Sequence, residues 1–203
     1  MHSSPCVSLA LAVSVALAAA SPAQALTVIP PSFEKLVAEA ELVVDGTVTG
    51  VRSQVEQSEG QPMVYTYVSI DVIETLKGSA SNAIELRMLG GTAGDLTVDI
   101  PGMPRFRAGE REVFFIVGNG SQFCPLVGIG HGLYPILNRA SDGAEVVVRH
   151  NFEALREVGQ VSKALYHSGA APRSRGAAGL SETMTVVEFK MQVRAEVAHA
   201  REQ

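Results

Sequence analysis

The stretch Val64-Tyr65-Thr66-Tyr67-Val68-Ser69-Ile70-Asp71-Val72 decides the fold class of this 203-residue chain. Valine, threonine and isoleucine occupy every second position, and tyrosine, serine and aspartate occupy the positions between them. Because successive side chains of a strand point to opposite faces, this period of two predicts a β-strand with one buried face.

Short strands are also predicted on both sides of this stretch. Residues 42–51 are rich in valine and threonine and contain Gly46 and Gly50, which predicts a strand that bends or bulges at its glycines. The polar residues 52–62 are expected to form a loop. Alternating or buried apolar patterns predict further strands at residues 83–89, 96–100, 112–117, 122–129, 133–137 and 145–149.

The connections between these segments indicate an antiparallel arrangement. Gly118-Asn119-Gly120 is expected to turn the chain back into the strand at residues 122–129, since these residues tolerate positive φ. Pro125 makes that returning strand an edge or bulged strand. Gly90-Gly91 precedes no helix, so it is expected to serve a tight turn or a close backbone approach. Seven or eight short strands favour a mainly β fold, as a barrel or sandwich.

The first 25 residues have the pattern of a signal peptide. An uncharged apolar run from Val7 to Ala20 is too short to span a membrane, and it leads to the small-x-small sequence Ala23-Gln24-Ala25. Cleavage is expected after Ala25, with export to the periplasm or to the outside of the cell. No later apolar run reaches membrane length, so no transmembrane segment is expected.

The remaining chain is expected to form one β-domain over residues 26–150, followed by a helical tail. Ser32 is expected to cap a short helix at the start of the domain. Residues 151–167 predict a helix, and the Gly/Ala/Pro/Arg-rich residues 168–180 predict a flexible linker.

The last segment, residues 181–203, is predicted to be an amphipathic helix. Thr185 and Glu188 have the spacing of a capping box at its start. An apolar stripe then follows on one face, while the polar face has mixed charge, so the helix is expected to dock on the β-domain rather than lie on a membrane.

The composition argues against nucleic-acid and metal chemistry. The net charge of −5 disfavours non-specific nucleic-acid binding. Cys124 remains alone once Cys6 leaves with the signal peptide, so it is expected to be a small buried hydrophobe. The five histidines are scattered rather than set at the spacings of a zinc site, so neither a metal nor another cofactor is expected.

The sequence contains no recognisable catalytic centre. It has no Gly-x-Ser-x-Gly elbow, and Asp95 and Asp99 are more typical of solvated carboxylates than of an acid–base pair. A non-enzymatic protein is therefore expected. One alternative stays open, which is a hydrolase that uses His131 together with Asp95 or Asp99.

Residues 101–111 form the most distinctive segment, with two prolines and three arginines. Phe106 is expected either to plug one end of the barrel or to stand exposed as an anchor. Arg105, Arg107 and Arg111 are either solvated charges or a patch that binds a small anionic ligand or a polysaccharide.

Four motifs carry a family resemblance, namely Leu-Lys-Gly at 76–78, Leu-Arg-x-x-Gly-Gly at 86–91, Pro-x-Phe-x-x-Gly-Glu at 104–110 and Val-Gly-x-x-x-Gly at 127–132. Over about residues 38–137 and the terminal helix, the chain resembles a group of uncharacterised secreted bacterial proteins. It is also similar to the netrin-like module, the OB-type barrel of the tissue inhibitors of metalloproteinases. The resemblance implies an OB-like Greek-key barrel with a short N-terminal helix and C-terminal helices.

The same resemblance suggests protease inhibition, but the inhibitory mechanism cannot be assigned to this chain. The inhibitors act through an N-terminal cysteine that chelates the protease zinc, whereas the expected mature chain begins at Leu26-Thr27. The leading hypothesis is a secreted, non-enzymatic binding module that engages another exported protein, for which a metalloprotease is one candidate. The candidate contact residues are Leu26, Thr27, Arg105, Phe106, Arg107 and Arg111.

Overall fold

The computed structural model describes residues 29–165 and 180–202. The predicted signal peptide, Leu26, Thr27 and the predicted linker, apart from Leu180, lie outside these residues. The described chain is mainly β, with eight strands and two α-helices. The elements are α2 (Phe33–Glu39), β1 (Leu42–Ser58), β2 (Gln61–Lys77), β3 (Ala83–Leu89), β4 (Gly91–Ala93), β5 (Leu96–Val98), β6 (Arg111–Ile116), β7 (Leu133–Asn138), β8 (Glu145–Val147) and α3 (Val186–Glu202).

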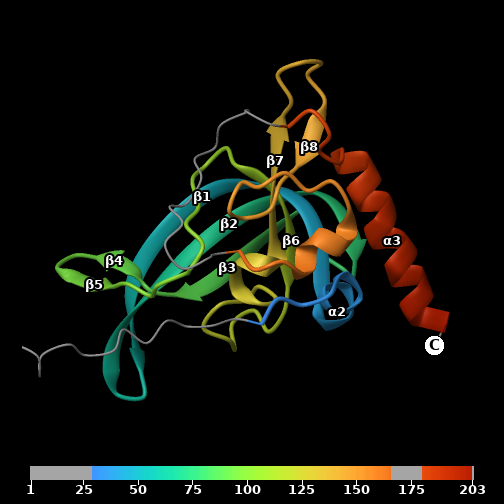
Figure 1. Ribbon diagram of the computed structural model, residues 1–203. Coiled ribbons are helices and arrows are strands. Elements are labelled where there is room, and N and C mark those ends of the chain that lie inside the picture. Colours follow the sequence, from blue (N-terminus) through green and yellow to red (C-terminus); the bar gives the residue numbers. More distant parts are fainter. Residues whose placement is uncertain (1–28, 166–179, 203) are drawn as a thin grey trace, which may run out of the picture.

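Six strands form one antiparallel sheet in the order β3-β2-β1-β6-β7-β8, and β4 pairs with β5 in a separate hairpin. Figure 1 shows the two α-helices on one side of the molecule, while the β4–β5 hairpin projects at the opposite end. No sheet closes on itself within the described residues. The expectation of a mainly β fold is therefore confirmed, whereas the closed barrel is not.

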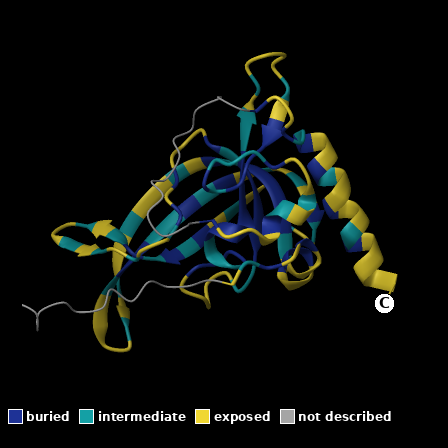
Figure 2. Cartoon of the chain, in the orientation of Figure 1, coloured by how far each residue is buried: buried dark blue, intermediate teal, exposed yellow. Residues whose placement is uncertain are grey.

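The first two strands form a long hairpin. Ser58 pairs with Gln61, and the intervening Glu59 and Gly60 have φ values of 50° and 79°, as a type I′ turn requires. The loop predicted over residues 52–62 is therefore wrong. These residues are polar because this end of the hairpin extends beyond the cores into solvent (Figure 2), not because the chain leaves the sheet.

The pairing of β1 with β2 is irregular at its glycines, as the sequence predicts. The register shifts between Asp45 and Gly46 and again between Val48 and Gly50. A Cβ atom on Gly46 would lie 2.6 Å from Cγ2 of Ile70, so glycine permits the close approach of the strands here. Bulges of this kind bend a hairpin and increase its twist.

A loop covers the outer edge of β3. The Asn119 side chain accepts a hydrogen bond from the N–H of Arg87 at 3.1 Å and donates one to the carbonyl of Glu85 at 2.8 Å. The sequence predicts a returning strand at residues 122–129 in this part of the chain. That prediction is wrong, because the segment makes an isolated bridge to β6 rather than a ladder, and Pro125 has no N–H to donate.

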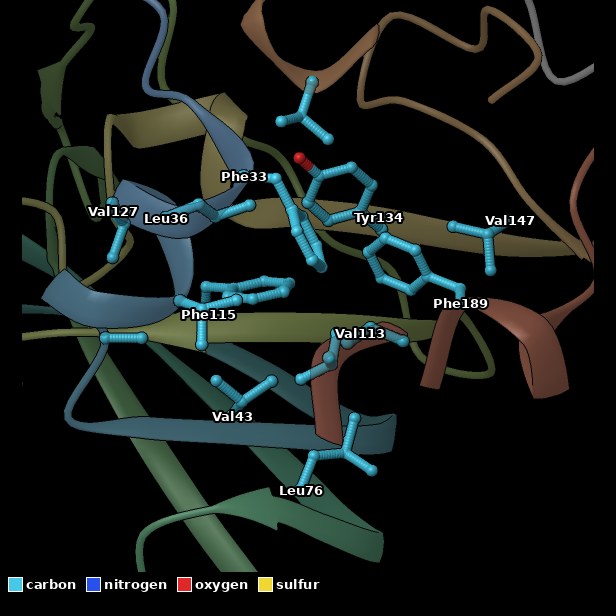
Figure 3. Packing of buried hydrophobic residues seen from close by; sticks show 14 of the residues in the cluster. Phe33, Leu36, Val43, Leu76, Val113, Phe115, Val127, Tyr134, Val147 and Phe189 are labelled. Carbon is cyan, nitrogen blue, oxygen red and sulfur yellow. The ribbon is translucent and has the colours of Figure 1, made fainter. Parts of the chain in front are cut away.

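The large sheet carries a core on each face. The helix-side core brings together four rings, Phe33 of α2, Phe115 of β6, Tyr134 of β7 and Phe189 of α3 (Figure 3). The ring centres of Tyr134 and Phe189 lie 4.9 Å apart, and those of Phe115 and Tyr134 lie 5.6 Å apart. Direct ring contacts therefore hold α3 to the sheet, and the ring of Phe33 joins α2 to α3 through Phe189.

The opposite face carries the groove-side core, which irregular segments cover in place of helices. Phe106 and Cys124 come from these segments and pack with side chains of the sheet. The buried members are Val44, Val48, Val68, Ile70, Leu86, Met88, Phe106, Phe114, Ile116, Cys124, Leu126 and Leu133.

An ion network fixes α3 to the sheet beside the helix-side core. Asp45 of β1 is fully buried and accepts hydrogen bonds from Arg111 of β6 at 2.9 and 2.8 Å and from Lys190 of α3 at 2.7 Å. Lys190 also contacts Glu74 at 2.8 Å, and Arg111 contacts Glu145 at 2.6 Å. Burial opposes ionisation of Asp45, but the hydrogen bonds from Arg111 and Lys190 outweigh it and hold its pKa below the ordinary value.

The helix ends agree with the sequence. The N–H of Lys35 donates to the Ser32 hydroxyl at the start of α2. Before α3, Thr185 and Glu188 donate hydrogen bonds to each other's side chains from their backbone N–H groups, at 2.8 and 3.3 Å. This is the predicted capping box.

The helix predicted over residues 151–167 is wrong for the described residues 151–165, which contain one short 3₁₀ helix, η3 (Val158–Ser162). The reason is the buried Arg149, which donates hydrogen bonds to the Glu153 carboxylate and to the Lys163 carbonyl. The segment wraps around this guanidinium because a buried charge must be paired.

Candidate functional site

A groove of about 480 Å³ lies between the β4–β5 hairpin, the β1–β2 hairpin and residues 99–106. Its volume falls within the range of roughly 300–1,000 Å³ that is usual for ligand sites. The apolar part of the lining includes Val51, Val98, Ile100, Met103, Pro104 and Phe106, and the hydroxyl groups come from Ser53, Thr66, Thr92 and Thr97. The groove is therefore apolar with a few fixed polar positions.

The floor of the groove is built around Gly91. The hydroxyl oxygens of Ser53 and Thr66 lie 2.9 Å apart, and Thr66 donates to the carbonyl of Gly90 at 2.7 Å. A Cβ atom on Gly91 would lie 2.3 Å from Oγ1 of Thr66 and 2.6 Å from Oγ of Ser53. The close backbone approach that the sequence predicts for Gly90-Gly91 is thus confirmed, and it brings β4 down onto β1 and β2.

The side of the groove nearest the groove-side core is formed by Phe106. Its ring is buried and stacks on Phe114 with 6.1 Å between the ring centres. Phe106 is therefore not an exposed anchor, and it belongs to the groove-side core rather than to the end of a closed barrel. The ring separates the groove from the packed interior of the sheet.

The rim of the groove carries one ion pair, Arg105 with Asp99 at 2.9 Å. Both side chains are well exposed, at 86% and 69%. They are the only charged residues among the described residues that line the groove. The lining is consequently close to neutral.

The three arginines of the 101–111 segment do not form an anion patch. Arg105 pairs with Asp99 at the groove rim, whereas Arg111 on β6 is bound by Asp45 and Glu145. Arg107 is exposed and does not line the groove. The structure therefore gives Arg105 and Arg111 separate acidic partners, which leaves no shared site for an anion.

The residues of the hydrolase alternative are also not brought together. His131 is buried in η2 (Ile129–Gly132), where burial, reinforced by the charge of Arg149, lowers its pKa to about 4. Asp99 pairs with Arg105, and Asp95 lies in the turn between β4 and β5. No hydrogen bond or ion pair joins His131 to either aspartate in the described chain.

Cys124 belongs to the groove-side core, as the sequence predicts for a small buried hydrophobe. Burial raises the pKa of its thiol to about 11. The thiol is therefore protonated at neutral pH, and a protonated thiol is a poor nucleophile.

The described residues contain no group of three or more His, Cys, Asp or Glu side chains placed to hold a metal ion. None of the helices among them has both the length and the apolar character needed to cross a membrane.

No model of a known protein family matches the chain, and no curated protein matches it either.

Sequence reasoning finds part of the groove and misses the rest. Arg105 and Phe106 are among the predicted contact residues and both line it. Ser53, Thr66 and Thr97 are missed, because residues that are far apart in sequence meet here only after β4 folds onto the β1–β2 hairpin. The one local signal is the Gly-Gly pair, which marks where the backbones approach.

Proposed function

We propose that the protein is a non-enzymatic, exported binding module that engages another exported protein through the groove beside the β4–β5 hairpin. The observation that carries this proposal is the groove itself, an open apolar cavity of about 480 Å³ with polar groups at fixed positions. Cavities of this character are typical of ligand-binding sites, and in protein interfaces such a pocket receives an anchoring side chain of the partner. It lies beside residues 99–106, and two of the six contact residues predicted from the sequence, Arg105 and Phe106, line it.

A protein partner is better supported than a small anion. An anion at Arg105 would have to displace Asp99, which already neutralises that guanidinium at 2.9 Å. The apolar lining around the pair offers no other cation to an anion. The metalloprotease that the family resemblance suggests is one possible partner of this kind.

We also propose that the large sheet is an open variant of the OB-like, netrin-like barrel. In support, β3 is bridged to the segment after β6 through Asn119. A side-chain bridge of this kind would stand where a closed barrel has strand pairing.

The test is capture of partners from the native mixture of exported proteins on immobilised protein. A matched pair of exposed valines supplies the variants, Val51 in the groove at 43% exposure and Val187 on α3 at 61%. We expect the Val51→Glu variant to lose the proteins that the wild type retains, and the Val187→Glu variant to keep them. If the Val51→Glu variant retained the same proteins as the wild type, the groove would not be the binding site.

A further inference from the structure

The outer edge of β5 is open, unlike the outer edges of the large sheet. β5 pairs with β4 on one side, and no other backbone hydrogen bond of β5 is present within the described residues. In contrast, Asn119 covers the edge of β3, and on β8 the N–H of Val147 donates to the carbonyl of Met184 at 2.9 Å. Both outer strands of the large sheet thus have contacts along their outer edges, whereas the outer edge of β5, beside the groove, is left without a backbone partner in the described residues.

The register of the β4–β5 hairpin identifies the free backbone groups. Ala93 pairs with Leu96 across a two-residue turn, and Thr92 pairs with Thr97. In an antiparallel ladder, hydrogen-bonded and non-hydrogen-bonded pairs alternate, and the pair that flanks a two-residue turn is hydrogen-bonded. The Thr92–Thr97 pair is then non-hydrogen-bonded, in accord with the 3.0 Å between its hydroxyl oxygens. The N–H and the carbonyl of Thr97 therefore point away from β4.

The lining of the groove beside this edge favours a segment with uncharged side chains. Its one ion pair, Arg105 with Asp99, is internally neutral. The residues that line the groove together with Thr97 include the apolar Val98, Ile100 and Met103. By charge complementarity, a charged side chain would lose hydration here without gaining a free partner, whereas an apolar side chain would fill the space.

We infer that an extended segment of the partner protein, with uncharged apolar side chains, adds to the outer edge of β5 as a strand. The N–H and the carbonyl of Thr97 form hydrogen bonds with the main chain of the partner segment, and alternate side chains of that segment enter the groove. This inference rests on the proposed function and specifies how the groove is used. A bound strand would extend the β4–β5 hairpin to three strands.

The experiment selects binders from a displayed library of short random linear peptides and measures their dissociation constants on purified variants. Thr97→Pro removes the outward N–H without removing a hydrogen bond to β4, and proline is tolerated on a sheet edge. Thr97→Val is the matched control, because it keeps the N–H and removes the hydroxyl. We expect about tenfold or greater weakening in Thr97→Pro, since a main-chain bond is lost and the ring obstructs the edge, and little change in Thr97→Val.

The selected peptides are also expected to be apolar and uncharged, and to slow hydrogen exchange of the Thr97 amide in the wild type. That exchange measurement decides the matter even if Thr97→Pro fails to fold. Unchanged exchange in the complex, or equal affinity for Thr97→Pro with weaker binding to Val51→Glu, would overturn strand addition while leaving the groove as the site. Equal affinity for Val51→Glu would instead count against the proposed function.

Discussion

The two ends of the molecule differ in how the sheet is covered. At the helix side, rings from α2, β6, β7 and α3 pack together in a buried core, and the buried Asp45 has two cationic partners. At the other end, the β4–β5 hairpin and residues 99–106 surround a groove and leave it open. Dense packing of this kind supplies stability, whereas an open apolar cavity costs contacts that a ligand can restore.

This comparison assigns different roles to the two regions. The helix-side core and its ion network should determine the free energy of unfolding. The groove should contribute less to that free energy and should determine binding. Substitutions in the two regions should therefore differ in how much they lower the free energy of unfolding and in how much they weaken binding.

The largest effect is expected from Phe189→Ala. Phe189 is fully buried and contacts the rings of Phe33, Phe115 and Tyr134. Loss of this ring should lower the free energy of unfolding by about 4 kcal/mol, because burial is lost and a cavity remains. Urea denaturation measures the change. A loss below about 1 kcal/mol would mean that α3 is not an integral part of the fold.

Asp45→Asn should have the next largest effect. It leaves Arg111 and Lys190 without their shared buried carboxylate, and removal of one partner of a buried pair typically costs about 3 kcal/mol or more. Asp99→Asn is the matched control, because Asp99 pairs with Arg105 and both side chains are well exposed, where such pairs contribute little. Equal losses in the free energy of unfolding would show that the buried Asp45 network contributes no more to stability than an exposed ion pair.

The difference between wild type and Asp45→Asn should depend on pH. The pKa of Asp45 is lower in the folded protein than the value of about 3.9 for an exposed aspartate. Its stabilisation is therefore complete above that value and is lost as the pH falls through the folded pKa. His131 also has a depressed pKa, but both proteins contain it, so its effect cancels. A difference that stayed constant down to pH 2 would contradict the low pKa of Asp45.

The features that the sequence predicts correctly are those that local chemistry controls. The strand at 64–72 follows from its own alternation, the capping box from the spacing of Thr185 and Glu188, and the bulges from Gly46 and Gly50. In each case the deciding groups are near one another in the chain. No distant contact is needed to infer them.

The failures come from contacts that are distant in sequence. Residues 52–62 look like a loop because no core covers them, although pairing with β2 keeps them extended. Residues 151–165 have helical spacing, but the buried guanidinium of Arg149 requires carbonyl and carboxylate partners from that segment. The groove depends on β4 packing against β1 and β2; the Gly90-Gly91 pair marks the close approach, but no local pattern identifies the partners Ser53 and Thr66.

Within the groove, the largest effect on stability should come from Gly91→Ala. The substitution places a Cβ atom against Thr66 and Ser53, and φ is 125° at this position. We expect a loss of about 2–3 kcal/mol by denaturation, from backbone strain and collision together. Gly94→Ala is the control, because φ is positive there but the space is empty, so it should cost about 1 kcal/mol. Equal costs would show that β4 can move away from β1 and β2.

The smallest effect is expected from Arg105→Gln. Arg105 and Asp99 are both exposed at the groove rim, and exposed pairs of this kind contribute about 0.2–1 kcal/mol. A double-mutant cycle with Asp99→Asn isolates the coupling between the two side chains from their other effects. A coupling energy below about 0.5 kcal/mol would mean that the Arg105–Asp99 pair at the groove rim contributes little to the free energy of unfolding. Coupling above about 2 kcal/mol would mean that the ion pair holds residues 99–106 against the hairpin, so the groove would share the structural role of the helix side.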